Sequence, residues 1–183
     1  ALEISRTNTF TYTNGMLYSH LSECGLATTN QWDALGRLLS ITHPDGTTVS
    51  NVYDKLDVVG RKDRLNQWTW TSYNALRQPL AMTNALGHVT RYAYCVCGSL
   101  EHVTNALGQV TTFYYDNAGH QTSVLLPDGS VNSRSYNKLG QLVVTTDALN
   151  RSTTNYYNNQ GLLTTVSNAL GRVQLMQFDI EDR

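Results

Sequence analysis

The fold of this chain is decided by residues 136–157, which read YNKLGQLVVTTDALNRSTTNYY. The stretch holds two turn signals, at residues 137–140 and 147–150, and each places Asn or Asp first and Gly or Asn fourth. That pattern is typical of a type I turn, because the Asx side chain caps the backbone and the fourth residue accepts a positive φ. The runs between the turns are rich in Val, Thr and Tyr, which favour strands. The stretch therefore predicts a unit of two antiparallel strands and two tight turns.

The same unit recurs along the whole chain. Its aromatic anchor returns every 20 or 21 residues, at Tyr12, Trp32, Tyr53, Tyr73, Tyr94, Tyr115, Tyr136, Tyr157 and Phe178. A second series marks the middle of each copy, at Gly46, Asn66, Gly87, Gly108, Gly129, Asn150 and Gly171. A single unit of this length cannot bury a core alone, so residues 1–183 are interpreted as one array of about nine copies.

The array predicts an all-β protein with almost no helix, because no segment carries a helical stripe of apolar residues. A meander this wide must curl, because twist accumulates from strand to strand. We expect turns at residues 33–36, 43–46, 84–87, 105–108, 116–119, 126–129, 137–140, 147–150, 158–161 and 168–171. Asp57 and Arg77 replace the expected turn glycine, which predicts reshaped or loosened turns, and the copy at Tyr12 has a turn that is one residue short.

Charge and hydropathy narrow the possible partners. Charged residues make up 15 % of the chain and the formal net charge is −1, which argues against binding to nucleic acid or to an anionic membrane. No apolar run is long enough for a transmembrane helix, so no membrane insertion is expected. We expect no signal peptide in the N-terminal residues of this sequence. Because copies are under way at Tyr12 and at Phe178, we expect the chain to be a fragment of a longer array.

Written as a consensus, the unit is Tyr-Asp/Asn-x-x-Gly-Arg/Gln-Leu, a strand, Thr-Asp/Asn-x-Leu-Gly, and a strand that ends in Tyr-x-Tyr or Tyr-Tyr. Clear examples are residues 32–38, 83–94 and 115–119. This pattern resembles the RHS, or YD-repeat, family over roughly residues 10–180. The resemblance implies tandem 21-residue β-hairpin repeats that form a curved, spiralling sheet, as part of a hollow shell. Family members include the shells of bacterial polymorphic toxins and insecticidal toxin complexes, and the barrels of teneurins.

The resemblance implies a non-enzymatic structural module: a wall segment that encloses or displays a polypeptide in a secreted or surface-exposed bacterial protein. Its expected partners are further RHS repeats or an enclosed effector, and no cofactor is expected. Two alternatives stay open. One is a binding module for glycans or a partner protein, which would use the aromatic and polar face of the sheet. The other is an extracellular filament that self-assembles head to tail, because strand edges that lack charge invite pairing.

Two groups of residues are the candidate sites. Cys95 and Cys97 are the candidate metal or redox ligands, and they would need Cys24 or a histidine to complete a site; the competing interpretation is that they are turn variants or a strained pair. The candidate glycan platform is formed by Tyr92, Tyr94, Phe113 and Tyr115, because aromatic rings stack on sugars. Regular aromatics in a repeat also serve as the apolar seam between hairpins, and we favour that structural interpretation. No catalytic residue is predicted.

Overall fold

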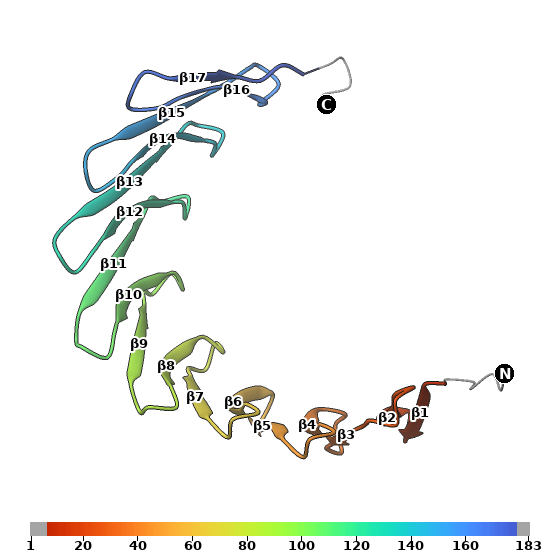
Figure 1. Cartoon of the computed structure of the whole chain (residues 1–183). Helices are drawn as coiled ribbons and strands as arrows, with labels where there is room; N and C mark the ends of the chain where they lie inside the picture. Colours follow the sequence, from red (N-terminus) through yellow and green to blue (C-terminus); the bar gives the residue numbers. More distant parts are fainter. Residues whose placement is uncertain (1–6, 179–183) are drawn as a thin grey trace. The chain divides into compact units, whose positions relative to one another are not determined.

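The computed structural model describes residues 7–178, and these residues form 17 β-strands and no helix (Figure 1). Strands pair in antiparallel fashion with the strands that precede and follow them in sequence. The predicted all-β fold of tandem hairpins is therefore confirmed. In the described part of the chain, nothing resembles a long apolar helix of the kind that crosses a membrane.

The strands fall into two compact units, residues 1–91 and 92–183, and the boundary lies inside strand β9. The first unit contains β1 (Thr9–Thr13), β2 (Met16–Leu21), β3 (Ala27–Trp32), β4 (Leu38–Thr42), β5 (Thr48–Asp54), β6 (Asp57–Lys62), β7 (Trp68–Tyr73), β8 (Pro79–Thr83) and the start of β9 (Val89–Tyr94). The second contains the end of β9, β10 (Leu100–Thr104), β11 (Val110–Tyr115), β12 (Gln121–Leu125), β13 (Val131–Tyr136), β14 (Leu142–Thr146), β15 (Ser152–Tyr157), β16 (Leu163–Ser167) and β17 (Val173–Leu175).

The turns follow one hydrogen-bond scheme, which the turn at residues 105–108 illustrates. Gly108 N donates to Asn105 O at 3.0 Å, and Asn105 N donates to Gln109 O at 3.0 Å. The Asn105 side chain accepts from Leu107 N and Gln109 N, both at 3.0 Å. The same backbone bonds close all ten predicted turns. They also close turns at residues 22–25, 63–66, 74–77 and 95–98, which lay outside the list of expected turns although Asn66 and Arg77 marked two of them.

The unusual turns behave in two ways. Arg77 keeps the left-handed conformation, with φ of +62°, and its N–H donates to Asn74 O at 3.0 Å, so the expectation of a loosened turn there is wrong. The surrounding hairpin imposes the conformation on a residue that would otherwise avoid it. The turn before Asp57 is reshaped as expected: it shortens to two residues, and Lys55 takes the positive φ of +51°.

The first copy also has the short turn that its sequence predicts. Thr13 pairs directly with Met16, and the two residues between them, Asn14 and Gly15, have φ of +51° and +78°. An Asn-Gly pair at positive φ is the preferred two-residue hairpin connection.

The anchor aromatics link each copy to the one before it. A shift in strand register precedes the anchor in β1, β3, β5, β7, β11, β13 and β15. Such a bulge bends and twists its strand locally. In five of these strands the anchor side chain donates to a carbonyl 15 residues earlier: Tyr157 OH bonds Leu142 O at 2.8 Å, and Trp32 Nε1 bonds Leu17 O at 2.8 Å. Tyr53, Tyr73 and Tyr136 make the equivalent bond.

No large apolar side chain of residues 7–178 is buried. Leucines at the hairpin tips are among the most exposed, including Leu107 at 83 %, Leu149 at 71 % and Leu170 at 81 %. Each unit is a single layer of sheet, and half-buried and exposed side chains cover its faces. Its order comes from backbone ladders and from contacts between neighbouring copies, and no central core contributes.

Candidate functional site

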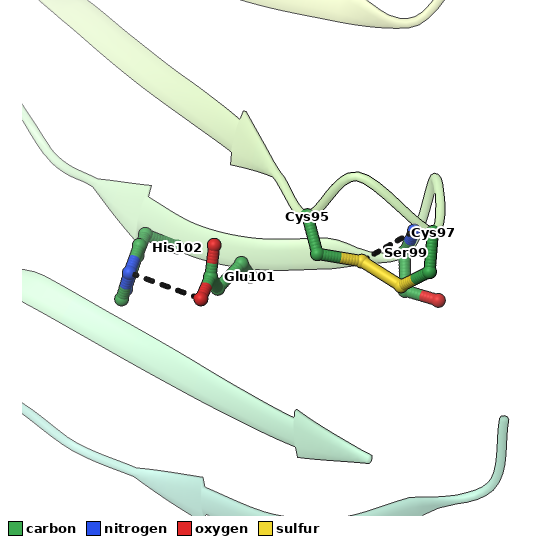
Figure 2. The surroundings of a disulfide bond; sticks show 5 residues. All are labelled: Cys95, Cys97, Ser99, Glu101 and His102. Atoms are coloured by element: carbon green, nitrogen blue, oxygen red, sulfur yellow. Dashed lines mark hydrogen bonds and ion pairs between the residues drawn. A yellow bond between two sulfur atoms is a disulfide. The ribbon is translucent and has the colours of Figure 1, made fainter. Parts of the chain in front are cut away.

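The turn between β9 and β10, residues 95–98, holds a disulfide between Cys95 and Cys97, whose Cα atoms are 5.2 Å apart (Figure 2). The hairpin positions both residues. Gly98 N donates to Cys95 O at 2.9 Å, and Cys95 N donates to Ser99 O at 3.0 Å, as in the other turns. Cys95 is half-buried, and Cys97 and Val96 are exposed. The disulfide therefore lies at a hairpin tip, open to solvent.

Cys95 occupies the first position of this turn, where most copies have Asp or Asn. Ser99 N donates to Cys95 Sγ at 3.3 Å, as Gln109 N donates to the Asn105 side chain (Figure 2). Asp33 holds the same first position in its own turn, and there the backbone N–H of Arg37, four residues later, is the main cause that lowers the pKa of Asp33. The first position of the turn therefore favours a negative charge. The sulfur of Cys95 thus sits in a backbone cradle suited to an anion.

The two candidate metal ligands are joined in a disulfide in this structure. Cys95 and Cys97 are bonded to each other, so neither offers a thiolate to a metal ion. Cys24 is a free, exposed thiol. Within residues 7–178, His, Cys, Asp and Glu form no group of three or more that could hold a metal.

The four aromatic candidates are half-buried and fall on two strands. Tyr92 and Tyr94 belong to β9 and Phe113 and Tyr115 to β11, with β10 between these strands. Burial, with a smaller contribution from Tyr92, raises the pKa of Tyr94. Phe113 lies opposite Val124 on β12. The structure thus brings Tyr92 and Tyr94 together as a pair, and it separates them by one strand from the other two.

A second aromatic feature, in the first unit, was missed by the sequence reasoning. Trp70 lies over Gly60, where an added Cβ would meet its ring at 2.6 Å, and it stacks on Trp68 with centroids 5.1 Å apart. The side of this platform opens on a depression of about 700 Å³ that Tyr73 and the ion pair between Asp57 and Arg77 also line. A signal was present: Gly60 is a glycine inside a strand run, which often marks a close approach.

Ion pairs also connect successive copies. Arg64 Nη2 lies 2.6 Å from Asp45 Oδ2, and the Thr47 hydroxyl donates to Asp45 Oδ1 at 2.6 Å. The Thr47 hydroxyl and backbone N–H, followed by Arg64, lower the pKa of Asp45 to about 2. These charges belong to the turns, and their geometry serves the connection between hairpins.

Comparison with known proteins gives a family match and a fold match. Residues 100–131 and 136–174 match the model of the RHS Repeat family. A crystal structure of TcdB2-TccC3 is similar, with a TM-score of 0.69 at 15 % identity; the match covers 94 % of this chain and 11 % of that chain. The Photorhabdus luminescens Tc holotoxin pore matches with a TM-score of 0.60 at 13 % identity, over 94 % of this chain and 12 % of that chain.

Two further facts limit what these similarities show about this chain. This chain spans about a tenth of the solved chains that it matches. No curated protein matched its sequence. The similar structures therefore show the fold, and the family match over residues 100–174 shows the repeat type.

Proposed function

Because residues 100–131 and 136–174 match the model of the RHS Repeat family, we propose that this chain belongs to that family and forms a wall segment of an RHS-type β-shell. Its role is mechanical: the repeats build a rigid sheet, and none of its residues performs chemistry in that role. The match over 94 % of the chain to TcdB2-TccC3 supports this proposal.

One observation carries the proposal: large apolar side chains stay exposed on a sheet that is one layer thick. Leu107, Leu149 and Leu170 project from hairpin tips, each more than two-thirds exposed, and Tyr114 and Tyr156 are about half exposed on the strands. Soluble monomers rarely leave extended apolar surface uncovered. A wall segment resolves this, because neighbouring parts of the shell cover its edges and the enclosed polypeptide covers its inner face.

The contacts between copies suit a wall that must hold its shape. Five anchor side chains tie their copies to the previous one, as Tyr157 does to Leu142 O. The Asn155 side chain donates to the same carbonyl at 3.0 Å. Such nearest-neighbour contacts propagate along a repeat array and stiffen it. We therefore propose that the shell encloses or displays a polypeptide, and that it does so in a secreted or surface-exposed bacterial protein.

Electron cryomicroscopy of the natural gene product tests this function. We expect residues 7–178 to lie in a continuous wall around an internal cavity, with Leu107 and Leu149 covered by neighbouring protein. A map in which both faces and the leucine-bearing tips of these residues stand free in solvent would refute the wall function.

A second candidate function is favoured by the Trp70 platform. A flat indole held by Gly60 and Trp68, beside the Asp57–Arg77 pair, offers a stacking surface with hydrogen-bonding groups, as carbohydrate sites do. The depression of about 700 Å³ lies in the usual range for small-ligand sites. We propose oligosaccharides as the ligand class for this surface.

The platform is tested by titrating the chain with a panel of oligosaccharides while following tryptophan fluorescence. Trp70→Ala should abolish any binding, and Gly60→Ala should weaken it because the added methyl group displaces the ring. Tyr156→Ala removes an exposed aromatic elsewhere and is the matched control. Binding that survives Trp70→Ala, or the absence of binding in the unaltered chain, would contradict this second function.

A further inference from the structure

The Cys95–Cys97 disulfide adds little to the stability of its hairpin. Its turn has the same backbone hydrogen bonds as the turns at residues 105–108 and 116–119, which hold no disulfide. A disulfide stabilises chiefly by restricting the unfolded chain, and this effect grows with the length of the loop that it closes. Cys95 and Cys97 are only two residues apart, so the loop is about as short as a disulfide can close. A structural role therefore does not account for this pair.

The two sulfurs differ in their surroundings in a way that suits exchange chemistry. Cys97 occupies the third position of the turn, the position at which Leu107 is 83 % exposed in the next turn of the same kind. An attacking thiolate can therefore reach Cys97 Sγ. Cys95 is half-buried, and its Sγ accepts the Ser99 N–H at 3.3 Å. A thiolate released at Cys95 would remain in this backbone cradle, and stabilising the leaving thiolate speeds exchange.

From this asymmetry we propose that the turn at residues 95–98 is a thiol–disulfide exchange site that oxidises dithiols of other polypeptides. A substrate thiolate attacks Cys97 Sγ, the bond between Cys97 and Cys95 breaks, and Cys95 leaves as a thiolate. The second substrate thiolate then attacks the substrate sulfur of the mixed disulfide and releases Cys97 as a thiolate. Two electrons pass from the substrate to the cysteine pair, the substrate gains one disulfide, and the substrate's two protons go to the released thiolates or to buffer.

The position of the site also fits a polypeptide substrate. Val96 is fully exposed between the two cysteines, and the disulfide lies in the turn that joins β9 to β10 (Figure 2). An extended dithiol peptide can approach an exposed tip without any opening of the fold. Glu101 and His102 follow on β10, where His102 Nε2 lies 3.9 Å from Glu101 Oε1.

The test uses the chain with Cys24→Ser, which removes the free thiol, and one equivalent of a reduced peptide that carries two cysteines. The mixture is kept free of oxygen, quenched with an alkylating reagent at successive times, and analysed by mass spectrometry. We expect one peptide disulfide to form per chain, with the early mixed disulfide on Cys97 in roughly tenfold excess over Cys95. The control is Cys95→Asn with Cys97→Leu, which gives this turn the first and third residues of the turn at 105–108.

Two outcomes of this experiment would overturn the proposal. Peptide oxidation no faster than with the control variant would overturn the proposal, and so would a mixed disulfide mainly on Cys95. In the Cys95→Ser variant the same peptide is supplied in its oxidised form: the Cys97 thiolate attacks the peptide disulfide, one peptide sulfur leaves as a thiolate, and alkylation of that thiolate should trap the peptide on Cys97. Failure to trap it would likewise count against the site.

Discussion

Replacing Gly140 by alanine should destabilise the chain more than the same replacement at Gly108, although the two backbones are alike. Their φ angles are +77° and +78°, so the cost of a Cβ in the left-handed conformation, about 1 kcal/mol, applies to both. The surroundings differ. Nothing lies within 4 Å of a Cβ at Gly108, and His120 Nε2 lies 2.9 Å from a Cβ at Gly140.

The His120 ring has little freedom to move away. It stacks on Tyr136 with centroids 4.7 Å apart, and its Nδ1 lies 3.0 Å from Asp116 Oδ2. Displacing the ring forfeits the stacking, which is worth about 0.5–1.5 kcal/mol. Gly140→Ala should therefore cost about 2 kcal/mol in total, and Gly108→Ala about half of that.

The assay is urea denaturation followed by circular dichroism, with the midpoints of both variants compared to that of the unaltered chain. His120→Ala supplies a double-mutant cycle: with the ring removed, Gly140→Ala should cost only the backbone contribution of about 1 kcal/mol. Equal losses at Gly108 and Gly140, or a cycle with no coupling, would refute the reasoning that neighbouring copies touch at this glycine.

Tyr157→Phe should lower the free energy of unfolding by about 0.5–1.5 kcal/mol, because the bond to Leu142 O is lost, and Tyr156→Phe, at the exposed neighbour, should be close to neutral in the same denaturation assay. Equal effects would mean that the anchor hydroxyl does not join the copies. Acidification should destabilise the chain: because folding lowers the pKa of Asp45 to about 2, its contribution is complete above pH 3.8 and is lost as the pH falls toward 2. Asp45→Asn should flatten the dependence of the urea midpoint on pH in that window. An unchanged profile would show that Asp45 does not cause the loss of stability in acid.

The sequence by itself determined the repeat, the strand-and-turn unit and its boundaries. This was possible because each turn is local: the Asx residue, the Gly or Asn three positions later and the hydrogen bonds between them lie within five residues of chain, as in residues 105–109. Where the local signal was weak, the prediction failed. Arg77 was expected to loosen its turn, and the pairing of β7 with β8 imposes the regular form.

Only the tertiary structure decided what joins the copies and what the special residues do. Tyr157 bonds a carbonyl 15 residues away, and Trp70 lies over Gly60 of the neighbouring strand. Cys95 and Cys97 form a disulfide, and the Ser99 N–H bonds the Cys95 sulfur; the sequence alone did not predict this contact. These contacts depend on strand register and on the bulge before each anchor, which shift side chains between faces without changing residue type. A repeat sequence therefore specifies its unit locally, and the contacts between units follow only from how the strands align.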